Sequence, residues 1–362
     1  MNKKNYLKMG LQLFSTSIFD LVTAQETASY WTENPKYRAP FLGEELFPAD
    51  KQLGTEIRWV KGATGAPKFL KPSGVDAPAI PRERAEFDQV LTKLGFFKES
   101  LYINENLRQQ LNLVIASGNQ VMIDAILNKI FADNANLIEA SRVTREILRM
   151  QLLMTGTATI AGNGQEYELD YGFKDSNKLD ASVSWSDHAN ADPIKDITAL
   201  MDAIETNSGE RPTRALTNLA TFNHIVASEK VRGALVSPIT PNAIVGRAQV
   251  IAFLESELGL KVAIYDKMYQ DANGVSKKFV EDNKFSLLPA NTVGTTAFAT
   301  TPEESDLMNS NVANVAIVDT GVAVTTMTKA DPVQVETKVT MNSLPTFEGI
   351  DYVGIITTEV AP

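Results

Sequence analysis

The residue types that most often carry catalysis are scarce in this chain of 362 residues, which has no cysteine and only two histidines, His188 and His224. Without cysteine the chain offers no disulfide, thiolate zinc site, iron–sulfur cluster or thiol nucleophile. Two histidines are too few for a histidine-rich metal site, and His224 sits where a packed or surface histidine is expected. We therefore predict no metal centre and no cofactor.

Three short polar runs resemble parts of functional motifs. Ser186-Asp187-His188 contains the residue types of a hydrolase triad, but triad members meet through the fold rather than along one loop. Asp271-x-Asn273-Gly274 matches the start of a calcium loop without its later acidic ligands, so a turn is favoured. Glu44-Glu45 are adjacent, and adjacent side chains of an extended chain point to opposite sides. The common nucleophile, zinc-protease and phosphate-binding motifs are also missing, so the sequence does not indicate an enzyme.

Charge is distributed unevenly along the chain. The 34 Lys+Arg and 44 Asp+Glu give a net charge of −10, which disfavours nucleic-acid binding because that affinity comes mainly from Lys and Arg. Between Gly54 and Arg84 six basic residues oppose three acidic ones, so this stretch carries +3 and the remainder −13. A basic arm on an acidic body predicts recognition between copies of the chain. A solvated flexible loop is the alternative.

The same stretch is rich in residues that interrupt regular structure. Residues 62–81 contain three glycines and four prolines, with too few large apolar side chains to form a core. The first 22 residues imitate a signal peptide, but polar residues interrupt the apolar stretch and its apolar residues recur at helical spacing. An amphipathic arm that packs on another surface is favoured over secretion. No run approaches the about 18 apolar residues of a membrane span, so we expect a soluble protein.

Periodicity predicts the elements that would position these residues. Helices are expected over 82–91, 104–115, 119–131 and 136–155, with Gly156 ending the last, and a hairpin follows at Gly162-Asn163-Gly164. From Trp185 onward helices and strands alternate, which is typical of an α/β or α+β domain. The expected elements there are helices 192–204, 221–235 and 242–258 and strands 214–218, 261–269, 277–280 and 285–288. Alternation over 333–341 predicts a half-buried strand, and 352–356 a more fully buried one.

Several segments together resemble the major capsid proteins of tailed bacteriophages, specifically the lambda-type phage capsid protein E family with the Hong Kong 97-like fold. The likeness covers nearly the whole chain. Its most specific segment is VAIYDKMYQDANGVSKKFVEDNKFSLLPANTVG at Val262–Gly294. The other segments are LFP at Leu46–Pro48, IRWVKG at Ile57–Gly62, FFKES at Phe96–Ser100, and EILRMQLLMTG at Glu146–Gly156 running into TATIAGNGQEYELDYG.

This resemblance implies an α+β fold in five parts. They are an N-terminal arm (1–50), an extended loop across an adjacent subunit (51–85), a peripheral domain with a spine helix (86–184), an axial domain (185–330), and C-terminal strands of the peripheral domain (331–362). The residues expected to contact neighbouring subunits through the extended loop are Arg58, Trp59, Lys61, Lys68, Lys71, Arg82 and Arg84. The residues expected to mark the spine helix are Ile147, Leu148 and Leu152.

The function implied is structural rather than enzymatic. Pentamers and hexamers would close into an icosahedral head shell that first assembles as a procapsid, then expands and encloses double-stranded DNA without sequence-specific binding. Only about 50 residues precede the extended loop, whereas some relatives carry a long built-in scaffold there, so we expect a separate scaffolding protein. A portal protein is a further expected partner, and a decoration protein is left open. The expected location is the virion, after assembly in the host bacterial cytoplasm. The alternatives are an encapsulin-like compartment shell and an acidic soluble α/β enzyme.

Overall fold

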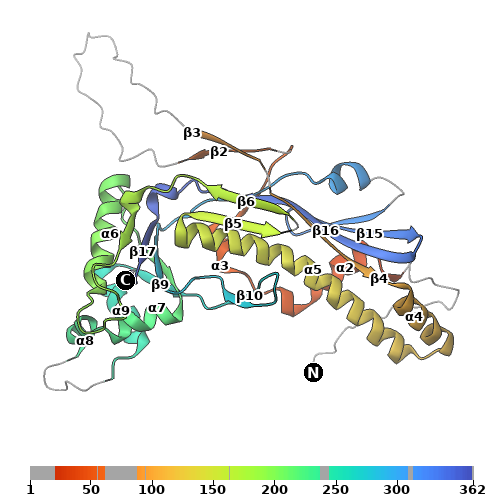
Figure 1. Ribbon diagram of the computed structural model, residues 1–362, viewed down its shortest axis with the longest axis horizontal. Helices are drawn as coiled ribbons and strands as arrows, with labels where there is room; N and C mark the ends of the chain where they lie inside the picture. Colours follow the sequence, from red (N-terminus) through yellow and green to blue (C-terminus); the bar gives the residue numbers. More distant parts are fainter. Residues whose placement is uncertain are drawn as a thin grey trace, which may run out of the picture. The chain divides into compact units, whose positions relative to one another are not determined.

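A computed structural model describes residues 21–54, 56–61, 88–93, 95–162, 164–236, 244–308 and 313–360 (Figure 1). The chain divides into two compact units. The first comprises Met1–Ala39, Phe96–Ser141 and Thr300–Met341, and the second comprises Pro40–Gly95, Arg142–Ala299 and Asn342–Pro362. Helix α5 (Gln120–Thr155) and strand β16 (Val333–Pro345) each contribute residues to both units.

The first unit packs two helices and the start of α5 against an antiparallel sheet. Its core is an apolar cluster that includes Leu111, Ile123, Leu127, Phe131 and Val335. Besides parts of α5 and β16, its elements are α2 (Ala24–Glu33), η1 (Pro35–Tyr37), β4 (Phe96–Ile103), α4 (Glu105–Ser117), the π-helix η3 (Glu303–Leu307), β14 (Asn314–Val318) and β15 (Val322–Ala330).

The N-terminal helix α2 is fixed to this sheet by polar and aromatic contacts. The Ala24 amide donates to Asn314 Oδ1 at 3.0 Å, and Tyr30 stacks on Phe131 with ring centroids 5.8 Å apart. The sequence predicts an arm that packs on another surface, and for the described residues that surface belongs to the same unit. The first 20 residues of the arm lie outside the described residues.

Strand β16 confirms the predicted strand at 333–341 but is more buried than its alternation suggests. It pairs antiparallel with β15 in the register Val322↔Met341 to Ala330↔Val333, and β4 pairs with it too. Its polar face is covered because Glu336 accepts a hydrogen bond from Tyr102 at 2.9 Å and pairs with Lys329 at 2.9 Å. Partners elsewhere in the fold thus allow a charged side chain to be buried.

The second unit contains a mixed five-stranded sheet in the order β7-β17-β12-β8-β9. In Figure 1 helices α6 to α9 gather with β17 and β9 at the end of the picture that carries the C-terminal label. Its core includes Trp185, whose indole N–H donates to Asp196 at 2.9 Å. The elements are β7 (Lys178–Asp180), α6 (Pro193–Ser208), β8 (Arg214–Thr217), α7 (Leu219–Ala227), α8 (Glu229–Leu235), α9 (Arg247–Leu258), β9 (Lys261–Ile264), β12 (Lys284–Leu288), η4 (Ile350–Tyr352) and β17 (Gly354–Thr357).

Further elements of the second unit surround α5. They are α3 (Leu42–Leu46), β1 (Ala49–Lys51), β2 (Glu56–Lys61), β3 (Asp88–Lys93), β5 (Thr157–Gly162), β6 (Gln165–Asp170), η2 (Asp175–Asn177), β10 (Met268–Gln270), β11 (Ser276–Lys278) and β13 (Thr296–Phe298). The predicted hairpin is confirmed as β5 and β6, which pair from Thr157↔Asp170 to Gly162↔Gln165. In the described part of the chain no helix is long and apolar enough to cross a membrane.

Two helix predictions are wrong. The helix expected at 82–91 is strand β3 where it is described, because residues 88–93 pair antiparallel with β2; residues 82–87 lie outside the described residues. The separate helices expected at 119–131 and 136–155 form one 36-residue helix, α5. Asp133 and Asn134 are poor helix formers at the expected break, but Asn134 is buried and donates to Thr337 at 3.3 Å.

The second unit also divides one predicted helix and shortens another. The expected helix 221–235 is two helices, α7 and α8, with Ser228 between them. The expected helix 242–258 begins at Arg247 in α9. Gly156 ends α5 as predicted, in a left-handed conformation with φ of +82°.

Candidate assembly site at the base of the extended loop

Strands β2 and β3 form a two-stranded ribbon on either side of residues 62–87, and residues 54–84 carry a net charge of +3. Trp59 anchors the ribbon. Its side chain is 5% exposed and meets Tyr171 edge to face, with ring centroids 4.9 Å apart. The Tyr171 hydroxyl donates to the Pro345 carbonyl at 2.7 Å, and burial raises the pKa of Tyr171, which keeps that proton in place. The ribbon is therefore held by a buried aromatic pair.

The predicted loop residues lie at different places in this arrangement. Arg58 and Lys61 are on β2, and Trp59 faces the interior of its own unit. The other four predicted contact residues lie outside the described residues: Lys68, Lys71, Arg82 and Arg84. The spine residues Leu148 and Leu152 are fully buried on α5, and Ile147 is half-buried.

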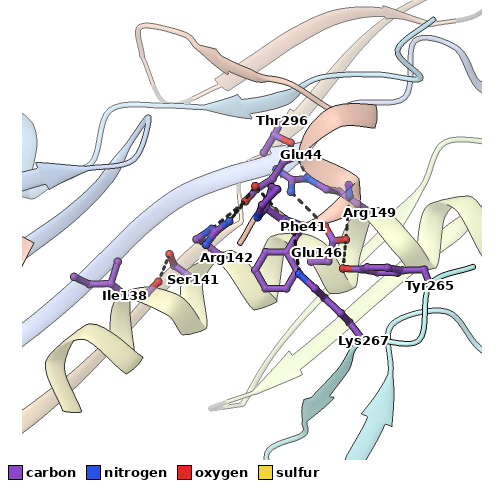
Figure 2. A network of polar contacts seen from close by, with 12 residues as sticks. Phe41, Glu44, Ile138, Ser141, Arg142, Glu146, Arg149, Tyr265, Lys267 and Thr296 are labelled. Carbon is purple, nitrogen blue, oxygen red and sulfur yellow. Dashed lines mark hydrogen bonds and ion pairs between the residues drawn. The ribbon is translucent and has the colours of Figure 1, made fainter. Parts of the chain in front are cut away.

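The segment that precedes the ribbon is tied to α5 by charged and aromatic groups (Figure 2). Arg142 on α5 forms a two-pronged ion pair with Glu44 on α3, with its Nε 2.9 Å from Oε1 and its Nη2 2.8 Å and 3.0 Å from Oε1 and Oε2. The Arg142 guanidinium lies 4.9 Å from the Phe41 ring centroid, and the Lys267 ammonium lies 4.5 Å from it. Lys267 also donates to the Pro40 carbonyl at 2.9 Å. Two cations therefore hold one aromatic ring.

One helical turn further along α5, the carboxylate of Glu146 is fully buried (Figure 2). It accepts hydrogen bonds from the Gly43 amide and from the Tyr265 hydroxyl, both at 3.0 Å, and from Arg149 at 3.4 Å. A Cβ on Gly43 would run into the Glu146 carboxylate, so only glycine allows this close approach. The buried carboxylate thus binds α3, α5 and the chain before β10.

Arg149 extends this polar network to strand β13. Its Nε and Nη2 donate to Thr296 Oγ1 at 2.9 Å and 2.7 Å. The Thr296 hydroxyl in turn donates to the Phe47 carbonyl at 2.9 Å. Phe47 lies two residues before strand β1, and β1 pairs parallel with β13. The chain that enters the ribbon is thereby fixed to the helix through a continuous run of hydrogen bonds.

Burial disfavours the charged form of both members of the Glu146–Arg149 pair. It raises the pKa of Glu146 and lowers the pKa of Arg149 to about 10, while their mutual attraction opposes both shifts. A buried pair of this kind is held together because either charge left alone would be costly. The network therefore fixes α3 and the chain just before β1 to helix α5.

The raised pKa of Glu146 predicts a specific pH dependence. Above its ordinary pKa of 4.5, Glu146 holds its proton more in the folded protein than in the unfolded chain because burial raises its pKa, so the free energy of unfolding falls as the pH rises towards the folded-state pKa. Glutamine cannot titrate. We expect chemical denaturation from pH 4 to pH 7 to show that the native protein loses stability relative to Glu146→Gln as the pH rises. A difference that stays constant over this range would contradict the prediction.

Sequence reasoning selected the apolar residues of α5, considered Glu44 only to reject it, and missed Arg142, Glu146 and Arg149. A signal was present, because Arg142, Glu146 and Arg149 recur at positions i, i+4 and i+7 of the helix and so share one face. On an isolated helix that pattern marks a solvated side. In the fold, α3 and β13 pack on this face and cover it.

The residues of the motif-like runs make structural hydrogen bonds. Ser186 donates to Glu359 at 2.9 Å, and Asp271 caps the turn between β10 and β11 by accepting from the Asn273 amide at 2.9 Å, as a turn predicts. The residues Glu44 and Glu45 lie on helix α3 rather than on extended chain, which corrects our expectation for them. Within the described ranges no group of three or more His, Cys, Asp or Glu side chains could hold a metal ion.

The fold is of the Hong Kong 97-like class. A prophage protein from E. coli CFT073 described as a capsid protein superposes with a TM-score of 0.57 at 15% identity, covering 93% of this chain and 99% of that one. The family model for phage major capsid protein E matches residues 23–358, so the chain belongs to that family. It is accordingly a shell-forming structural protein and a component of the virion.

Other solved structures are more distant. A phage-related protein from Bordetella bronchiseptica RB50 aligns with a TM-score of 0.49 at 10% identity, covering 94% of this chain and 98% of that one. The capsid of cyanophage A-1(L) aligns with a TM-score of 0.47 at 13% identity, covering 90% of this chain and 99% of that one. A comparison with curated proteins finds no match.

Proposed function

We propose that this major capsid protein forms pentamers and hexamers in which the extended loop, residues 51–85, lies across an adjacent subunit. The family match over residues 23–358 carries the proposal. Two features support the loop's part in it: the +3 charge of residues 54–84 on a chain of net charge −10, and the ribbon held at its base by Trp59. Because Trp59 is buried in its own unit, its proposed role is to anchor the loop, while the basic residues contact the neighbour.

The five-part division of the chain is also proposed. Helices α6 to α9 with their mixed sheet support an axial domain that begins near residue 185. The last part of the proposed axial domain, 300–330, belongs to the first compact unit, where β14 pairs with β15 and β15 pairs with β16. We further propose a non-enzymatic role, assembly in the host bacterial cytoplasm, a separate scaffolding protein and a portal protein.

Electron microscopy of negatively stained preparations tests the shell. We expect uniform closed icosahedral particles when the chain is expressed with its scaffolding protein, and irregular assemblies when it is expressed alone. Uniform closed shells from the chain alone would remove the need for a scaffold. A dispersed monomer under both conditions would contradict shell formation. Double-stranded DNA inside particles from the native source separates a phage head from an encapsulin-like compartment.

A further inference from the structure

The chain's only two histidines, 36 residues apart in sequence, meet in the second compact unit. His188 Nε2 lies 3.1 Å from His224 Nδ1, and the two ring centroids are 5.4 Å apart with the planes inclined by 33°. The His188 residue is exposed and His224 is partly exposed, so the pair is open to solvent. The two imidazoles therefore present ring nitrogens to each other at an accessible surface.

The backbone around both histidines is well fixed. His188 lies in the loop before α6, and its carbonyl accepts from the Glu229 amide at 2.8 Å at the start of α8. Ser228, which ends α7, donates from its hydroxyl to the Ala191 carbonyl at 3.2 Å and from its amide to the His224 carbonyl at 3.0 Å. The loop and the α7–α8 junction are thus joined on both sides of the pair. The nearness of the rings is a consequence of this framework.

The separation of the two nitrogens suits a shared metal ion. With metal–nitrogen bonds of about 2.05 Å, as for zinc bound to histidine, a nitrogen–nitrogen distance near 3.1 Å corresponds to an angle at the metal of roughly 100°. That angle lies between those of octahedral and tetrahedral coordination. Both nitrogens can turn lone pairs toward one point if the ring proton between them shifts to the other nitrogen of its own ring and the rings rotate slightly. The side chain of Asp187, the residue before His188, accepts a hydrogen bond from the Asn190 side-chain amide at 2.8 Å.

We propose that His188 and His224 form a two-histidine site for a late first-row divalent transition metal ion such as Ni²⁺, Cu²⁺ or Zn²⁺, with water in the remaining positions. Imidazole nitrogen selects these ions, whereas Mg²⁺ and Ca²⁺ prefer oxygen ligands. A bound ion would join the loop before α6 to helix α7 and so stabilise the second unit. The scarcity of histidine does not prevent a metal site, because the fold brings both residues together.

Metal binding by the untagged protein tests the proposal. Calorimetry should give one Ni²⁺ per chain, and Ni²⁺ at about tenfold above its Kd should raise Tm by roughly 2–4 °C. Each single substitution, His188→Gln or His224→Gln, should weaken binding on the order of 100-fold, because the second ligand no longer acts within the same site. Bound Cu²⁺ should show two coordinated nitrogens in its electron paramagnetic resonance spectrum.

The controls separate this site from nonspecific binding. Asn223→Ala, at an exposed position beside His224 on α7, should bind Ni²⁺ as the native protein does, and Mg²⁺ should leave Tm unchanged. The proposal is overturned if the double variant keeps the same Ni²⁺-induced shift, or if the native protein binds no Ni²⁺ at millimolar concentration.

Discussion

Replacing Arg149 with methionine is expected to lower the free energy of unfolding by about 3–5 kcal/mol, because it leaves the buried carboxylate of Glu146 without its cation. The Glu146 side chain is fully buried and that of Arg149 is 3% exposed, so water cannot replace the lost partner. The Thr296 hydroxyl also loses both guanidinium donors. Chemical denaturation of the unassembled protein at pH 7 measures the effect.

Two further variants identify the cause of this loss. Arg211→Met removes an arginine that pairs with Asp202 and Glu205 at the surface, and we expect a change of at most about 1 kcal/mol. The double variant Glu146→Leu, Arg149→Met should recover part of the loss, because no unpaired charge stays buried. If Arg149→Met and Arg211→Met lower the free energy of unfolding by the same amount, the polar network is not a support for the loop.

Reversing the charge of Lys61, Lys68 and Lys71 to glutamate is expected to abolish closed particles while the unassembled protein stays folded. The substitutions change the charge of residues 54–84 from +3 to −3 on a chain that is already acidic. Attraction between the loop and a neighbouring subunit then becomes repulsion. Electron microscopy counts the particles, and circular dichroism with the thermal transition reports whether the protein is folded.

A matched control tests whether the effect on assembly depends on where the charge is reversed or only on the net charge. Lys195, Lys230 and Lys261 are exposed lysines outside the loop, and their reversal to glutamate gives the same net charge. We expect this control to assemble far better than the loop variant. Salt should partly rescue the loop variant, because screening weakens the repulsion. Normal particles from the loop variant would exclude an electrostatic role for the extended loop.

Local patterns were reliable where neighbouring residues decide the structure. The helix expected at 192–204 is α6, which Asp192 caps by accepting from the Lys195 amide at 3.2 Å, and Gly156 ends α5 as predicted. The helix expected over 82–91 fails because β2, some 30 residues earlier in sequence, pairs with residues 88–93. A short segment such as Asp88–Lys93 can form a helix or a strand, and here its pairing partner decides between them.

The sequence by itself determined the absence of cysteine chemistry, the uneven charge and the family resemblance, since all three depend only on residue identity and order. The tertiary structure alone decided which polar residues support one another. Glu146 contacts Gly43 and Tyr265, more than a hundred residues away on either side, and His188 meets His224 across 36 residues. No periodicity records such contacts, because they arise only when distant elements pack and exclude water from the groups between them.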